Sequence, residues 1–243
     1  MSEYRKRVYQ NYARNRGHGL APATLEGFTP RAPTLRKVIR RYFPANRSAR
    51  VLDLGCGHGA LIHFVREAGY ADVTGVDVSA DQVEAARRLG IEGVRRGDLL
   101  DTLAMLPEAS QDVVVSFDVI EHFTRNELVP FVDQVRRVLR PGGRWIIHTP
   151  NGDSPFVGAI RYGDLTHELA FTQSSLSQLL LSSGFSRAEF YESGPVAASV
   201  KGAVRVVVWR TIRLGLRLWL AAETGDTGRT AIFTRNLFAI AFK

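Results

Sequence analysis

The sequence predicts an α/β fold, a Rossmann-like sheet of seven mostly parallel strands with helices on both faces. Three observations carry this prediction. From Arg50 onward, short apolar segments alternate with amphipathic helical segments, the connections between them are short, and glycines end helices at Gly69 and Gly90. Alternation of this kind is typical of a parallel sheet that is covered on both faces.

Composition limits the chain to one sizeable domain and excludes several classes of protein. A chain of 243 residues with 45% hydrophobic residues can bury a single core of ordinary size. No apolar run approaches the ~18 residues of a membrane span, and residues 1–16 lack the apolar region of a signal peptide. Cys56 is the only cysteine and cannot form an intramolecular disulfide. These features predict a cytoplasmic protein.

The positive charge is concentrated at the two ends of the chain. Residues 1–50 carry a net charge of +10 and residues 201–243 carry +6, whereas residues 51–150 carry −5 and residues 151–200 carry −3. Basic segments that flank a mildly acidic body favour a polyanionic partner, such as anionic lipid, nucleic acid or a phosphorylated carrier. A solvated basic surface explains the same counts equally well.

Residues 1–47 are predicted to form an N-terminal helical cap. One helix is expected over residues 3–16, as either a lid over a pocket or a packing helix. A second helix is expected over Thr34 to Phe43, where Pro44 stops it. The apolar face of the first helix consists of Tyr4, Val8, Tyr9 and Tyr12.

Residues 48–243 are predicted to form the α/β domain itself. A helical insertion at about residues 194–230 precedes its last strand. The expected strands lie near residues 50–55, 72–77, 92–97, 112–117, 144–149, 185–192 and 236–242. The expected helices between them lie near residues 59–69, 79–89, 126–139 and 173–183.

The carboxyl ends of the expected strands favour ligand binding, because ligands of open parallel sheets lie outside those ends. The first strand runs into a loop with Gly55, Gly57 and Gly59, which lets a ligand approach the main chain at the start of the next helix. Asp77 follows the loop by about 20 residues, the separation at which a carboxylate can accept hydrogen bonds from both hydroxyls of a ribose. Asp98 ends the third strand and is placed to accept from an adenine amino group.

Five segments together resemble the class I S-adenosylmethionine-dependent methyltransferases, in particular the branch of the ubiquinone-biosynthesis and sugar O-methyltransferases. The segments are VLDLGCGHG, VTGVDVS, RRGDLLD, QDVVVSFDVIEHF and RVLRPGGRWIIHTPN, in the order and spacing of that family over roughly residues 48–192. The resemblance implies S-adenosylmethionine as the cofactor. A dinucleotide-binding loop is the competing interpretation, but GxGxGA departs from the GxGxxG of that fingerprint.

The resemblance also implies how the cofactor is held. The glycine loop would border its methionine part, with Asp53 supporting the loop. Asp77 would hold the ribose and Val78 would pack on the adenine, whose edge Asp98 and the Leu99 main chain would read. The complete cofactor site expected on this basis consists of Asp53, Gly55, Cys56, Gly57, Gly59, Asp77, Val78, Asp98, Leu99 and Phe117.

Asp118, Glu121 and His122 follow the fourth strand, and His167 lies farther along the chain. Methyl transfer to a hydroxyl needs a base or a metal that lowers the cost of losing the proton. Three interpretations stay open: His122 is the general base, oriented by Glu121; the four residues bind Mg²⁺, Mn²⁺ or Zn²⁺; or Glu121 and His122 only shape the acceptor pocket. Members of the resembling family bind a metal with a Glu-x-x-Glu-His cluster, and Asp118 stands here where glutamate is usual.

Residues 203–222 are almost wholly apolar except for four arginines. A helical projection places Arg210, Arg213 and Arg217 in one narrow stripe. Such a helix suits the interface of an anionic membrane, and packing against the domain or a second subunit is the alternative. The side opposite the stripe is predicted to carry Trp209, Ile212, Leu216, Trp219 and Leu220.

Together these features predict an S-adenosylmethionine-dependent methyltransferase that methylates a hydroxyl of a glycan, a lipid-linked sugar or another amphiphilic acceptor. Polysaccharide biosynthesis at the inner face of the membrane, as a peripheral membrane protein, is the expected setting, and a homodimer is one possible assembly. Two alternatives are kept. An RNA 2′-O-methyltransferase is favoured by the basic N-terminal segment, although no RNA-binding module accompanies it. The other is a cofactor-binding interaction protein without turnover.

Overall fold

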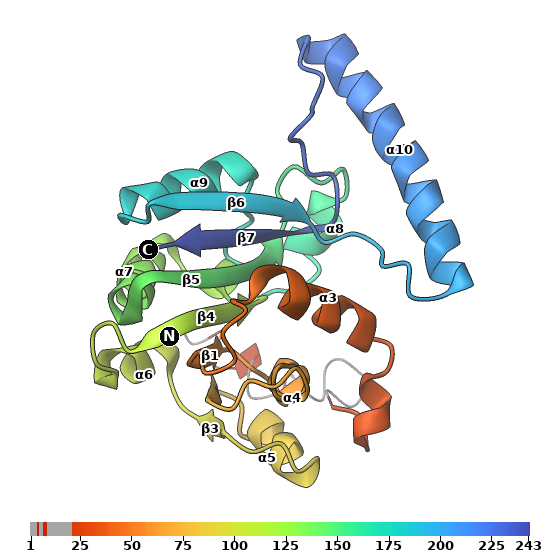
Figure 1. The fold of residues 1–243 in the computed structure, drawn as a ribbon. Coiled ribbons are helices and arrows are strands. Elements are labelled where there is room, and N and C mark those ends of the chain that lie inside the picture. Colours follow the sequence, from red (N-terminus) through yellow and green to blue (C-terminus); the bar gives the residue numbers. More distant parts are fainter. Residues whose placement is uncertain (1–3, 5–6, 9–20) are drawn as a thin grey trace.

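Seven strands form one sheet (Figure 1) in the computed structural model, which describes residue 4, residues 7–8 and residues 21–243. The strands are β1 (Val51–Leu54), β2 (Val73–Asp77), β3 (Val94–Arg96), β4 (Gln111–Phe117), β5 (Leu139–Pro150), β6 (Arg187–Glu192) and β7 (Asn236–Phe242). Their order across the sheet is β3-β2-β1-β4-β5-β7-β6. Neighbouring strands run parallel except that β7 pairs antiparallel with both β5 and β6. The predicted fold class is confirmed.

Most helices lie within a few residues of their predicted positions. These are α3 (Ala32–Tyr42), α4 (Ala60–Glu67), α5 (Ala80–Arg88), α7 (Arg125–Val138) and α9 (Gln173–Ser182). The sequence did not predict α6 (Leu99–Met105), α8 (Val157–Arg161) or the 3-10 helices η1 (Leu25–Phe28) and η2 (Ile120–His122). The reason is their shortness: α6 buries only Leu103 and α8 buries no residue, so neither shows a periodic apolar stripe.

Two cores cover the two faces of the sheet. Alternate residues of a strand point to opposite faces, so Val51 and Val113 pack with α3 and α4. Leu52 and Val114 pack on the other face with α7 and α9. Because the central strands are buried on both faces, a ligand can reach them only at their ends.

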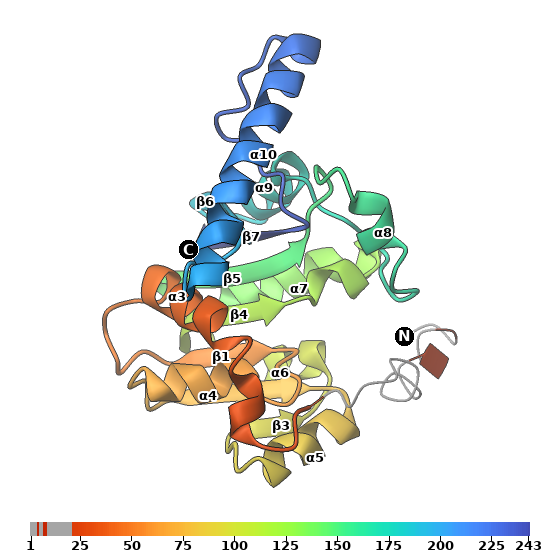
Figure 2. The same cartoon turned by 90° about the vertical axis from the view of Figure 1, so that its right-hand side faces the viewer.

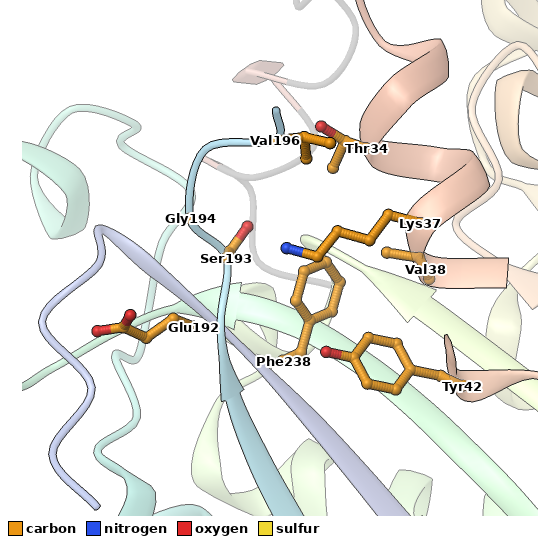
Figure 3. Close-up of a pocket in the computed structure, with 9 residues that line it drawn as sticks. All are labelled: Thr34, Lys37, Val38, Tyr42, Glu192, Ser193, Gly194, Val196 and Phe238. Carbon is orange, nitrogen blue, oxygen red and sulfur yellow. The ribbon is translucent and has the colours of Figure 1, made fainter. Parts of the chain in front are cut away.

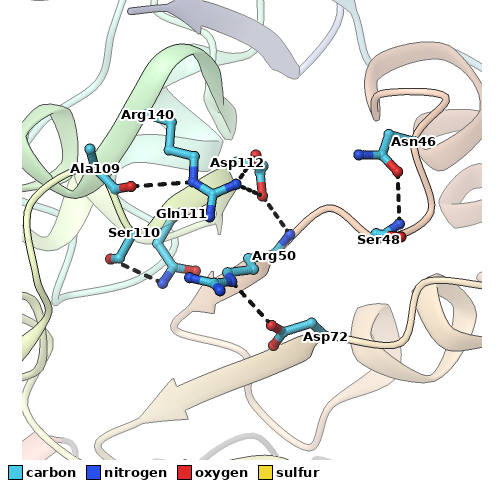
Figure 4. A network of polar contacts seen from close by, with 9 residues as sticks. All are labelled: Asn46, Ser48, Arg50, Asp72, Ala109, Ser110, Gln111, Asp112 and Arg140. Atoms are coloured by element: carbon cyan, nitrogen blue, oxygen red, sulfur yellow. Dashed lines mark hydrogen bonds and ion pairs between the residues drawn. The ribbon is translucent and has the colours of Figure 1, made fainter.

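A polar network fixes the amino ends of the central strands (Figure 4). Arg140 Nη1 lies 3.0 Å from Asp112 Oδ1, and the Arg50 main-chain N–H donates to Asp112 Oδ2 at 2.8 Å. The Arg50 side chain lies 3.5 Å from Asp72 Oδ2. These contacts link the amino ends of β1, β2, β4 and β5. The carboxyl ends of the same strands, on the opposite side of the domain, remain available for binding.

Helix α10 (Val200–Thr224) occupies the predicted insertion and projects away from the domain (Figures 1 and 2). Gly202 is its only buried residue. Within the described part of the chain, no helix has the combined length and apolar character that crossing a membrane requires. Side chains near the middle of the helix contact Glu192, and the chain that returns beside the helix contacts Arg217.

The orientation of α10 corrects the helical projection. Arg213 Nε lies 3.2 Å from Glu192 Oε1, and the indole N–H of Trp209 donates to Glu192 Oε2 at 3.3 Å. Arg217 Nε donates to the Thr227 carbonyl at 3.1 Å. Two arginines of the predicted stripe, which the membrane interpretation directs toward lipid, thus face the domain or the returning chain. The Glu192 carboxylate at the end of β6 attracts Arg213, and a projection of the isolated helix cannot locate that carboxylate.

The predicted helix over residues 3–16 falls mostly outside the described residues. Tyr4, Arg7 and Val8 are helical, and the Tyr4 hydroxyl donates a hydrogen bond to the Glu168 carboxylate. Tyr9 and Tyr12 lie outside the described residues. A lid formed by this helix stays a prediction.

Candidate active site

The glycine loop joins β1 to α4 in a conformation that side chains rarely adopt. Gly55, Gly57 and Gly59 have φ angles of 74°, 54° and 80°. A Cβ atom on Gly55 would lie 2.5 Å from Val119 Cγ2, so this position also needs glycine for packing. At Gly57 the nearest atom to such a Cβ is 3.6 Å away, on Gln82. That distance is ordinary van der Waals contact, so Gly57 is required for its positive φ and not for packing.

Asp77 fastens the glycine loop to the end of β2. Its Oδ2 accepts a hydrogen bond from the Gly57 N–H at 2.8 Å, and its Oδ1 accepts from the Ser79 N–H at 2.8 Å. Each carboxylate oxygen keeps a second lone pair for a ligand. Asp53 lies buried beside this carboxylate, and burial, with the charge of Asp77, raises the pKa of Asp53 to about 8.

Asp98 lies at the same edge of the sheet but has a structural task as well. Its side chain caps α6 by accepting from the Leu100 N–H at 2.8 Å and the Asp101 N–H at 3.3 Å. Asp98 and Val78 are both exposed at this edge. The predicted cofactor residues are therefore gathered at the ends of β1, β2 and β3.

His58 and Phe28 are residues of this region that the sequence reasoning missed. His58 is buried, its Nδ1 lies 3.0 Å from Gln82 Oε1, and its ring stacks on Phe28 with centroids 5.5 Å apart. His58 could have been found from the sequence, because it is the polar side chain between Gly57 and Gly59 of the loop. No local pattern pointed to Phe28, because η1 reaches the loop from a distant part of the sequence.

Asp118 does not join the other predicted metal ligands. Its Oδ1 lies 2.9 Å from His148 Nδ1, and His148 Nε2 lies 3.0 Å from Ser193 Oγ. Phe117, the last residue of β4, is paired with His148 of β5. Asp118 follows Phe117 and therefore lies beside the His148 imidazole. Asp118 also has a left-handed φ of 54°, which is uncommon for a residue with a side chain.

Glu121, His122 and His167 do converge. One donor atom from each lies within 4.8 Å of the others, and the two imidazole rings meet edge to face with centroids 4.8 Å apart. Thr149 Oγ1 donates to Glu121 Oε2 at 3.0 Å, whereas the buried Glu121 Oε1 has no hydrogen-bond partner. Burial and the nearby charge of Asp118 raise the pKa of Glu121 well above its ordinary value.

Thr166, rather than Glu121, provides the clearest contact that orients His122. The Thr166 hydroxyl donates to Asp164 Oδ1 at 2.6 Å, so its oxygen accepts from His122 Nδ1–H at 2.9 Å. This tautomer leaves the lone pair of the neutral imidazole on Nε2. Burial, followed by the charge of His167, lowers the pKa of His122 to about 4. The imidazole is therefore neutral, and able to accept a proton, above about pH 4.

A small pocket adjoins Ser193 on the α3 face of the sheet (Figure 3). The Lys37 side chain extends into it from α3, and burial, with the charges of Arg41 and Arg40, lowers the pKa of Lys37. The sequence reasoning missed this pocket because its two walls are distant in sequence. Its lining consists of Thr34, Lys37, Val38, Tyr42, Glu192, Ser193, Gly194, Val196 and Phe238.

Replacing Glu121 by glutamine is expected to stabilise the protein at neutral pH. Folding at pH 7 requires this carboxylate to take up a proton or to stay charged while buried, and each pKa unit of elevation costs about 1.4 kcal/mol. The ordinary pKa is 4.5, so the cost is absent well below that pH and grows as the pH rises. Glu121→Gln should unfold about 2–4 °C higher than the wild type at pH 7.

Thermal unfolding at pH 4 and pH 7 tests this expectation. Glu84→Gln, on the exposed surface of α5, is the matched control and should change neither melting temperature. An equal difference between Glu121→Gln and the wild type at both pH values would contradict the raised pKa.

Comparisons with known proteins were made for sequence and structure. Residues 51–143 match the family model described as a methyltransferase domain. A Mycolicibacterium smegmatis protein named "Probable S-adenosylmethionine-dependent methyltransferase" is 35% identical over 136 residues, which are 56% of this chain and 51% of that protein. A ubiquinone biosynthesis O-methyltransferase of Idiomarina loihiensis is 36% identical over 106 residues, 42% of each chain. The chain thus spans about half the length of these curated relatives.

The fold has counterparts among solved structures. A SAM-dependent methyltransferase from Archaeoglobus fulgidus superposes with a TM-score of 0.64, covering 87% of this chain and 94% of that chain. The two sequences are 21% identical. At that identity the likeness concerns the fold alone.

Proposed function

We propose that this chain, which belongs to the methyltransferase-domain family over residues 51–143, transfers a methyl group from S-adenosylmethionine. The observation that carries the proposal is the glycine loop held by Asp77 through the 2.8 Å bond from Gly57. The positive-φ glycine loop and the second lone pairs of the Asp77 carboxylate fit a ligand that has an amino-acid part and a ribose. The name of the Mycolicibacterium smegmatis relative supports the choice of cofactor.

In this proposal, different residues at the strand ends bind different parts of the cofactor. The loop from Gly55 to Gly59 borders the methionine part, and Asp77 accepts hydrogen bonds from the ribose hydroxyls. Val78 packs on the adenine, and Asp98 receives its amino group without leaving its position at the start of α6. The cofactor supplies the electrophilic methyl group, and the protein aligns the acceptor with it and excludes water.

The acceptor is proposed to be a hydroxyl group, with His122 as the general base. The neutral imidazole has its lone pair on Nε2, because Nδ1 donates to Thr166. A base of this kind takes the hydroxyl proton as the oxygen attacks the methyl carbon.

A divalent metal held by Glu121, His122 and His167 is the competing proposal for activating the hydroxyl. The unpartnered Glu121 Oε1 and the convergence of the three donor atoms fit a metal ion. Such an ion would lower the pKa of the acceptor hydroxyl as a Lewis acid. The two proposals exclude each other if the metal takes His122 Nε2, because that atom could not then accept a proton.

The acceptor class proposed is an amphiphilic molecule: a lipid-linked sugar, a glycan or a phenolic lipid. The ubiquinone-biosynthesis names of several relatives support an acceptor of this character. Calorimetry with S-adenosylmethionine tests cofactor binding first. Mass spectrometry of lipids, glycans and RNA from cells with and without the gene then tests the acceptor, which should lose one CH₂ unit when the gene is absent. Micromolar cofactor binding without any methylated product in these fractions would favour an interaction protein instead.

A further inference from the structure

Helix α10 has an apolar surface on the side that faces away from the domain. We call this surface the outer face of α10. Its side chains are between 49% and 84% exposed and lie on one side of the helix, where the exposed Thr211 is the polar residue among them. The outer face consists of Val200, Val204, Val207, Val208, Ile212, Leu214, Leu218 and Trp219.

The charged residues beside the outer face are basic, except for Glu223 in the last turn of α10. Successive residues of a helix are about 100° apart, so Arg205 and Arg210 lie on opposite flanks of this face, and both are exposed. Lys201 is exposed in the first turn. The sequence has no acidic residue between Glu192 and Glu223. The outer face is thus an apolar strip whose border is positively charged over residues 200–222 and ends at Glu223.

We propose that the outer face of α10 binds the surface of an anionic membrane. The apolar side chains would enter the boundary between headgroups and acyl chains, and Arg205 and Arg210 would meet lipid phosphates. A second copy of the chain fits the charges less well. In a symmetric pair Lys201, Arg205 and Arg210 of each helix would border a helix whose single acidic residue is Glu223, so positive charge would exceed negative charge at the contact.

The topology places α10 on the same side of the domain as the candidate active site. Strand β6 runs parallel to β5, because both are antiparallel to β7, and therefore ends at the edge where β1, β4 and β5 end. Helix α10 begins a short connection after Glu192. Figure 1 shows it on the side toward which β4, β5 and β6 point. Membrane binding through α10 would keep this edge near the bilayer.

Binding of the full chain to vesicles tests the proposal. Phosphatidylcholine vesicles with phosphatidylglycerol should bind the wild type, and pure phosphatidylcholine vesicles should bind it far less. The double variant L218E/W219E should lose at least about 100-fold in affinity, because two exposed apolar side chains that would enter the membrane become charged. R205Q/R210Q should lose about 30-fold and become less sensitive to salt. M105E is the matched control, since Met105 is exposed on α6.

Several results would overturn the proposal. One is a wild type that does not bind the anionic vesicles, and another is unchanged binding by both double variants. A stable dimer in solution that L218E/W219E dissociates would assign the outer face to a second copy. Calorimetry with S-adenosylmethionine should give the same affinity for the wild type and L218E/W219E. This assay shows that the variant is folded, and it keeps the membrane proposal separate from the proposed methyl transfer.

Discussion

Replacing Asp77 by asparagine is expected to weaken the binding of S-adenosylmethionine by about 100-fold or more. The carboxylate would accept two charge-assisted hydrogen bonds from the ribose, and each is worth about 1.5–3 kcal/mol. The variant also disturbs the bonds from the Gly57 and Ser79 N–H groups, which hold the glycine loop. Both effects lower affinity, and calorimetry measures their sum.

A ligand change separates the two effects of Asp77→Asn. A 2′-deoxy analogue of S-adenosylhomocysteine lacks one of the ribose hydroxyls, so the wild type should bind it more weakly than the parent compound. Asp77→Asn should bind the two compounds about equally if the ribose contact exists. Asp81→Asn, an exposed acid nearby on α5, is the charge-matched control. Wild-type affinity in Asp77→Asn would remove the basis of the proposed cofactor site.

Replacing His122 by alanine is expected to lower the rate of methyl transfer by about 100- to 10,000-fold, the usual contribution of a general base. The cofactor affinity should be unchanged, because His122 lies after β4 and not in the glycine loop. With its pKa at about 4, the imidazole is unprotonated from pH 5 to pH 9. His122 should therefore cause no loss of rate as the pH falls from 8 to 5, and a loss only near pH 4.

Single-turnover rates with the identified acceptor, with and without chelator, test the role of His122. A base predicts that chelator has no effect, and that His167→Ala retains much more activity than His122→Ala. A metal predicts that chelator, Glu121→Gln and His167→Ala each lower the rate about as much as His122→Ala. His63→Ala on α4 is the control histidine and should stay within a few-fold of the wild type. Full activity in His122→Ala would refute both mechanisms.

Much of the fold and of the candidate cofactor site could be predicted from the sequence, because both depend on local patterns. Strand and helix periodicity places the elements, and a parallel sheet brings the ends of its strands to one edge. Gly57 and Asp77 therefore lie together as expected, although nothing in the sequence indicated that the aspartate would hold the loop directly. Short elements escaped prediction, because a helix such as α6 buries a single side chain.

The sequence by itself determined the sheet, the glycine loop and the acids at the strand ends, since these follow from periodicity and short-range turn chemistry. Only the tertiary structure decided which distant side chains meet. It joined Asp118 to His148 through the pairing of β4 with β5, and turned Arg213 toward Glu192. The physical reason is that a side chain's partner is set by packing and by the nearest opposite charge in space. Because Arg213 of α10 is held toward Glu192, the apolar side of the helix faces outward.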